Sequence, residues 1–72
     1  MAREVPIRGD MIRLGQLLKL ADVVGGGGDV KHLLADGAVR VNGAPEARRG
    51  RQLHPGDEVD VDGEVIRVVA GG

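Results

Sequence analysis

Apolar residues recur along the chain with two different spacings, which separate helical segments from extended ones. Leu14, Leu17, Leu18 and Ala21 stand at positions i, i+3, i+4 and i+7, so they share one face of a helix. We expect this helix to begin at Leu14. It should end before the four glycines at 25–28, because glycine in a helix loses much backbone entropy.

A second short helix is predicted directly after the glycines. Asp29 is a suitable N-cap, since its carboxylate can accept a hydrogen bond from a free N–H of the first turn. Val30, Leu33 and Leu34 would form the buried face of this helix. Gly37 stands where a left-handed C-terminal cap is expected, so the helix should end just before it.

Alternating apolar and polar residues predict β-strands on both sides of the helices. Residues 4–8 read as a short strand, in which Pro6 suits an edge position because it donates no backbone hydrogen bond. After the helices, the ranges 39–41, 58–61 and 64–70 carry valine or isoleucine in alternation with charged residues. The chain therefore has at least three strands in its second half.

Three turn signals separate these later strands. Asn42-Gly43 and Asp62-Gly63 are typical of tight hairpin turns, and Pro55-Gly56 fits the central pair of a type II turn. The order of strand, helix, helix and further strands predicts an α+β domain. Its two short helices should pack on a small, mostly antiparallel sheet.

The composition restricts both the core and the chemistry. The chain has 72 residues, enough for one small domain, and it contains no Phe, Tyr, Trp or Cys. It also contains no Ser or Thr. The core must therefore be aliphatic, and disulfides, thiolate metal sites, hydroxyl or thiol nucleophiles and aromatic stacking on bases are all excluded. We expect no enzymatic activity and no cofactor.

No apolar run approaches the roughly 20 residues that span a bilayer, and the first ten residues lack the apolar core of a signal peptide. We therefore expect a cytoplasmic protein without a membrane partner.

Charge is distributed unevenly along the chain. Residues 1–51 carry nine Lys/Arg and six Asp/Glu, a balance of +3, whereas residues 52–72 carry one Arg and five acids, a balance of −4. The two balances add up to the net charge of −1. A basic body with an acidic end can direct one side of a small domain toward a polyanion.

The range 14–59 resembles the RNA-binding domain named after the fourth protein of the small ribosomal subunit, the S4 domain. The resemblance is carried by LGQLLKLADVV, DVKHLLADG, VRVNG and PGDEV. It implies an S4-like (alpha-L) motif with extra terminal strands. Residues 1–72 would then form one domain, with the motif core at 14–59, a terminal hairpin and strand at 60–70 and a tail at 71–72.

The segment EARRGR at 46–51 narrows the resemblance to small bacterial proteins in which this domain stands alone. Their usual motif has threonine where this chain has Ala47. The resemblance implies that the two helices and this loop bind RNA. Carried over by position, the RNA-binding candidates are Lys19, Lys31, Arg48, Arg49 and Arg51.

The absence of aromatic residues favours structured RNA over single strands, because sequence-tolerant binding of single strands usually relies on stacking. Phosphate contacts and shape should dominate, and guanidinium groups suit phosphates through paired hydrogen bonds. We expect a monomer that binds ribosomal or transfer RNA, plausibly on the ribosome. Three arginines within four positions should repel one another when no anion is nearby.

Two other functions fit parts of the sequence. The terminal Gly71-Gly72, together with VNG and the GDEV-like turn, resembles ubiquitin-like sulfur carriers, whose C-terminal carboxylate becomes a thiocarboxylate. A protein-interaction module that docks through the acidic hairpin is the second alternative. We favour RNA binding, because a carrier would leave the arginine cluster unexplained. His32 and His54 are too few for a metal site.

Overall fold

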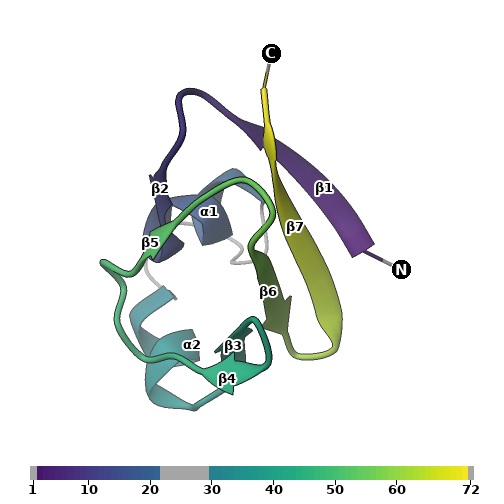
Figure 1. The fold of residues 1–72 in the computed structure, drawn as a ribbon. Helices are drawn as coiled ribbons and strands as arrows, with labels where there is room; N and C mark the ends of the chain where they lie inside the picture. The colour runs from purple at the N-terminus through teal and green to yellow at the C-terminus, as the bar shows by residue number, and fades with distance from the viewer. Residues whose placement is uncertain (1, 22–29, 72) are drawn as a thin grey trace.

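The structure is a computed structural model that describes residues 2–21 and 30–71 (Figure 1). Within these residues the elements are, in chain order, β1 (Ala2–Ile7), β2 (Ile12–Arg13), α1 (Leu14–Leu20), α2 (Val30–Ala35), β3 (Val39–Val41), β4 (Ala44–Pro45), β5 (Gln52–Leu53), β6 (Glu58–Val61) and β7 (Glu64–Ala70). Every helix and strand that the pattern predicts is present. The short strands β2, β4 and β5 were not predicted.

Five of the strands form one sheet in the order β1-β7-β6-β3-β4. The neighbours β7-β6, β6-β3 and β3-β4 are antiparallel, so the predicted mostly antiparallel sheet is confirmed. β1 lies at the edge, as Pro6 indicated, but it runs parallel to β7. Alternation along a strand shows which side chains are buried and carries no information on the direction of a neighbouring strand.

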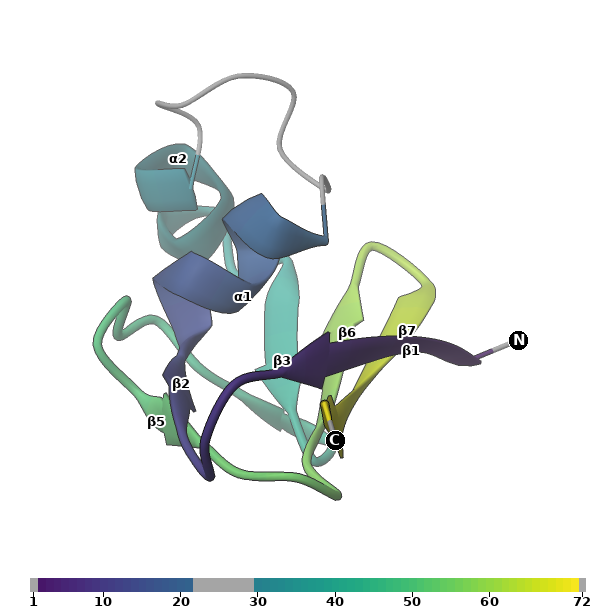
Figure 2. The same ribbon diagram turned by 90° about the horizontal axis from the view of Figure 1, so that it is seen from above.

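Both helices lie on the same side of this sheet (Figure 2). The buried apolar side chains of the sheet face them and join one aliphatic cluster, whose members from β3, β6 and β7 are Val39, Val41, Val59, Val61, Ile66 and Val68. Charged residues alternate with these valines on the other face. No charged or polar residue is buried in the described parts of the chain. The sheet is therefore covered on one face and solvated on the other, as antiparallel sheets commonly are.

The first helix follows its predicted face closely. α1 begins at Leu14, and the four residues of the i, i+3, i+4, i+7 pattern are all buried. The helix ends at Leu20, before the glycine run. Leu20 itself is 57% exposed, because it falls outside the buried face.

The second helix is confirmed as well. Val30 and Leu34 are buried, and Leu33 is partly buried against the same cluster. Gly37 has a φ of 72°, the left-handed conformation expected of a C-terminal cap. The predicted N-cap Asp29 lies outside the described residues.

The predicted turns have the backbone that their residues favour. Asn42 and Gly43 have φ values of 51° and 86°, and Asp62 and Gly63 follow the same pattern with 53° and 90°. Two consecutive positive φ values are the mark of a type I′ hairpin turn, whose twist matches that of the flanking strands. Gly56 also has a positive φ of 100°, as a type II turn requires.

Asn42 has a second role that its turn propensity does not reveal. Its side-chain N–H donates to Asp57 Oδ1 at 3.1 Å, and its side-chain oxygen accepts from the backbone N–H of Glu58 at 3.0 Å. Asp57 Oδ2 accepts from the backbone N–H of His54 at 2.7 Å, and this bond is the main cause of its lowered pKa. The first hairpin turn is thereby tied to the Pro55-Gly56 turn and to the start of β6.

The end of β7 is held against β1. The backbone N–H of Gly71 donates to the carbonyl oxygen of Ile7 at 2.9 Å. A Cβ on Gly71 would lie 2.5 Å from that oxygen, so the two backbones approach more closely than any other residue would allow. The exposed Gly71, directly after β7, is thus fixed to the end of β1 by its backbone.

Candidate nucleic-acid interface

The arginine loop, residues 46–51, is docked on the first turn of α1. The N–H of Leu14 donates to the carbonyl oxygen of Arg51 at 2.8 Å, and the N–H of Gly15 donates to that of Arg49 at 2.9 Å. The first N–H groups of a helix have no partner within the helix, and here the loop supplies it. The arginine loop is therefore positioned by backbone hydrogen bonds.

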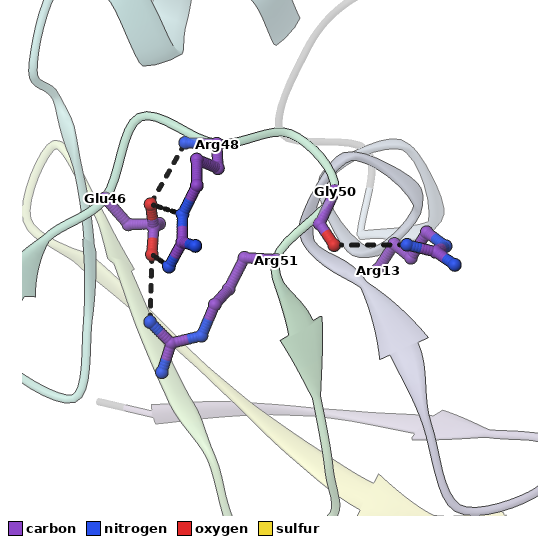
Figure 3. Close-up of polar contacts among 5 residues, drawn as sticks. All are labelled: Arg13, Glu46, Arg48, Gly50 and Arg51. Carbon is purple, nitrogen blue, oxygen red and sulfur yellow. Dashed lines mark hydrogen bonds and ion pairs between the residues drawn. The ribbon is translucent and has the colours of Figure 1, made fainter.

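Two further contacts hold the same junction. Arg13 Nη1 donates to the carbonyl oxygen of Gly50 at 3.3 Å (Figure 3), and the pairing of β2 with β5 sets Arg13 opposite Gln52. The short β2-β5 ladder, which the sequence did not predict, therefore brings the arginine loop to the helix.

Gly15 makes room for the side chain of Arg49. A Cβ at Gly15 would lie 2.5 Å from Arg49 Cγ and 3.1 Å from Arg49 Cδ, well inside ordinary contact distance. The Arg49 side chain therefore lies directly across the first turn of α1. Glycine is unfavourable inside a helix, and the close approach of the Arg49 side chain explains why glycine occupies position 15.

Arg49 borders two shallow grooves on the protein surface. The first, called here the Lys19 groove, is lined by Arg13, Gly15, Gln16, Lys19, Arg49 and Gly50. The second, the Lys31 groove, is lined by Lys31, Leu34, Ala35, Ala47 and Arg49. Arg49 thus stands between the lysine of α1 and the lysine of α2.

A third groove adjoins the Lys19 groove at Gly50. This His54 groove is lined by Arg48, Gly50, Arg51, Gln52 and His54. The Lys19 groove shares Arg49 with the Lys31 groove and Gly50 with the His54 groove, and together the three grooves are lined by all five predicted RNA-binding residues. Arg13 and His54, which the sequence did not single out, also line these grooves.

Two arginines of the loop have an anion nearby, so the condition under which we expected mutual repulsion is not met for them. The Glu46 carboxylate accepts hydrogen bonds from the backbone N–H, Nε and Nη2 of Arg48, at 3.0 to 3.1 Å. It also accepts one from Arg51 Nη1 at 2.8 Å (Figure 3). Glu46 therefore offsets the charge of Arg48 and Arg51 inside the loop itself, whereas Arg49 has no such partner among the described residues.

Glu46 is strongly acidic for this reason. The Arg48 side chain, its backbone N–H and the Arg51 side chain, in that order of effect, lower the pKa of Glu46 to about 2. The pKa of Arg48 is raised by the same hydrogen bond. Glu46 remains ionised, and Arg48 and Arg51 remain paired, throughout the range of neutral and mildly acidic pH.

Acidic residues of the C-terminal hairpin lie elsewhere. The turn between β6 and β7 is on the opposite side of the molecule from the arginine loop in both views (Figures 1 and 2). At this turn Glu64 pairs with Arg3 at 3.7 Å, and at the other end of the hairpin Glu58 pairs with Arg67 at 2.6 Å. Asp57, in contrast, contacts His54 of the His54 groove, so the acidic residues of the second half of the chain are not all remote from the arginine loop.

An alanine at Gly15 is expected to weaken RNA binding by about tenfold while the protein stays folded. The Cβ would push the Arg49 side chain away from its place, whereas alanine favours a helix over glycine by about 1 kcal/mol. RNA titrations and thermal melts of Gly15→Ala check this expectation. In an Arg49→Ala background the same substitution should change binding little, and an equal loss in both backgrounds would disprove the link.

The described residues contain no group of three His, Cys, Asp or Glu side chains placed to hold a metal ion. The same parts of the chain include no helix long and apolar enough to cross a membrane.

Comparison with known proteins agrees with the fold and with the motifs. A family model described as the S4 domain matches residues 5–69. The "Probable ribosome maturation protein RlbA" of Bacillus subtilis (strain 168) is 49% identical over 63 residues, which cover 88% of this chain and 89% of that protein. The alignment spans nearly the whole of both proteins, as the resemblance to stand-alone bacterial domains implied. This chain belongs to the S4 domain family.

Proposed function

We propose that this protein binds structured RNA through the three connected grooves and that it acts on the ribosome. The observation that carries the proposal is the gathering of Lys19, Lys31 and the arginine loop around Arg49. These cations come from two helices and a loop. A folded RNA presents phosphates from more than one direction, and such a surface can meet several of them together.

The chemistry of the grooves suits phosphate rather than bases. Guanidinium groups offer pairs of N–H donors in a plane, and the lysine ammonium groups add compact charges. No aromatic side chain is present in the sequence to stack on a base. We therefore propose recognition by phosphate position and RNA shape, without catalysis and without a cofactor.

Ribosomal RNA is the target that we favour over transfer RNA. The 49% identical relative is named a ribosome maturation protein, and its alignment includes nearly all of this chain.

We also propose that the protein acts as a monomer in the cytoplasm. Pro6 lies in the edge strand β1, where it interrupts the row of donors that another strand would need.

The alternatives have weaker support. A sulfur carrier needs a free C-terminal segment to enter its activating enzyme, and the hydrogen bond between Gly71 and Ile7 weighs against this. Formation of a thiocarboxylate at Gly72 in the presence of ATP and an activating enzyme would reverse our ranking. The docking module is less well supported because two carboxylates of the acidic hairpin already pair with Arg3 and Arg67 of the same chain.

The salt dependence of binding tests the proposal. We expect the logarithm of the affinity for a folded RNA hairpin to fall with the logarithm of the salt concentration, with a slope of about 3 to 5. We obtain that slope by assigning one phosphate contact to each predicted basic residue, since each contact adds roughly 0.7 to 0.9 to the slope. A single strand of equal length should bind more weakly. Affinity that is independent of salt, or equal for both RNAs, would contradict the proposal.

A further inference from the structure

Glu46 is an unusual residue to find within a surface that binds RNA. Its side chain is only 9% exposed, and it accepts four hydrogen bonds from Arg48 and Arg51. A carboxylate beside the phosphate contacts costs affinity, because it repels RNA and occupies the donors that RNA would use.

The two arginines that Glu46 holds remain within reach of a ligand. The Arg48 side chain is 74% exposed and that of Arg51 is 37% exposed, and both line the His54 groove. A phosphate and a carboxylate accept from a guanidinium group in the same paired geometry. A phosphate can thus take the place of the carboxylate on these two guanidinium groups.

The loop backbone has anchors besides the Glu46 carboxylate, which accepts one backbone bond, from the N–H of Arg48. The bonds from Leu14 and Gly15 to the carbonyl groups of Arg51 and Arg49 fix the loop on α1. A hydrogen bond from the Glu46 N–H to the carbonyl oxygen of Val39, at 3.1 Å, adds a backbone anchor. Moving the Glu46 carboxylate therefore releases the side chains of Arg48 and Arg51 and the N–H of Arg48, while the three backbone bonds named above still hold the loop.

Arg49 differs from its two neighbours. Within residues 2–21 and 30–71 no acidic side chain lies within ion-pair distance of it. It stands ready between Lys19 and Lys31, whereas Arg48 and Arg51 have a partner already. In the loop, Arg49 can thus bind a phosphate directly, whereas Arg48 and Arg51 can do so only after Glu46 has been displaced.

We propose that Glu46 competes with RNA phosphate for Arg48 and Arg51 and so makes the interface selective. This inference rests on the proposed function. An RNA that offers a phosphate only at Arg49 leaves the Glu46 pairs intact and binds weakly. An RNA whose shape brings a further phosphate into the His54 groove displaces the carboxylate and gains both arginines. Specificity then arises because an RNA that contacts only Arg49 is disfavoured by the Glu46 carboxylate.

The Glu46→Gln variant tests the competition directly. We expect it to bind a single-stranded uridine oligomer about tenfold more tightly than the wild type, because the charged competitor for Arg48 and Arg51 is gone. The salt slope should become steeper by about 1 to 2, because two arginines join the phosphate contacts. The preference for a folded hairpin over the oligomer should fall.

Glu58→Gln is the matched control. It removes one negative charge from a carboxylate that is also paired with an arginine, Arg67, but that borders none of the three grooves. Its affinity for both RNAs should equal that of the wild type. A gain by Glu58→Gln as large as that by Glu46→Gln would overturn the inference, because net charge alone would then explain it.

The failure of this inference can be told apart from that of the proposed function. If Arg49→Ala loses binding but Glu46→Gln binds the oligomer no better than the wild type, only the competition is wrong. If Arg49→Ala binds as the wild type does, the interface itself is wrong.

A measurement on the wild type remains decisive even if Glu46→Gln does not fold. In nuclear magnetic resonance spectra, the Arg48 Nε–H signal should shift when a folded hairpin is added, because its acceptor changes from carboxylate to phosphate. A signal that stays unchanged at saturating RNA would overturn the proposal.

Discussion

An Arg48→Ala, Arg49→Ala, Arg51→Ala triple variant is expected to bind a structured RNA at least about a hundredfold more weakly than the wild type. Arg49 links the Lys19 and Lys31 grooves, and Arg48 and Arg51 supply the donors of the His54 groove. The triple variant would retain only the lysines and Arg13 near the site. The salt slope should also fall by about 2 to 3, since three phosphate contacts are lost.

Folding has to be monitored in this experiment, because the triple variant leaves Glu46 without its side-chain partners. A thermal melt shows whether the domain persists, and the single variant Arg49→Ala avoids the problem because Glu46 keeps both pairs. A variant lacking Arg3, Arg40 and Arg67 loses the same charge away from the grooves and should retain most of the affinity. A folded triple variant with wild-type affinity would refute the site assignment.

The Leu17→Ala variant is expected to lose about 2 to 5 kcal/mol of the free energy of unfolding. Leu17 lies on the buried face of α1 and has no exposed surface. A domain of this size has about 4 to 11 kcal/mol in total, at roughly 0.05 to 0.15 kcal/mol per residue. The melting temperature should fall by about 10 °C or more, as measured by circular dichroism.

Leu20→Ala provides the control on the same helix. Leu20 is 57% exposed, so its truncation should change the stability by less than about 0.5 kcal/mol. Equal losses for the two variants would mean that α1 does not pack on the sheet through its predicted face.

The parts of the fold that the sequence predicted are those encoded locally. Asn42-Gly43 and Asp62-Gly63 set the hairpins because their residue types tolerate a positive φ, whatever surrounds them. The face of α1 followed from the spacing of leucines. The direction of β1 was not predicted, because parallel strands are not joined by a hairpin turn that the sequence could show.

The interface was predicted less completely, since its organisation depends on contacts between distant segments. The basic residues were found from a motif, but the motif could not show that Arg49 lies against Gly15. Glu46 was visible beside the arginines, two and five positions before Arg48 and Arg51, yet charge counting treated the arginines as a repelling group. Its partial burial could not be read from the sequence, and that burial makes it a partner of both arginines.

The parallel pairing of β1 with β7 has a consequence for how the chain folds. Ala2 lies opposite Val65 and Ile7 opposite Ala70, and β7 is the only neighbour of β1 within the described sheet. During synthesis β1 leaves the ribosome well before β7, so it has no strand to pair with until nearly all of the described chain has emerged. Contacts of such long sequence separation slow folding. The first strand of the described chain is therefore among the last to pair in the sheet.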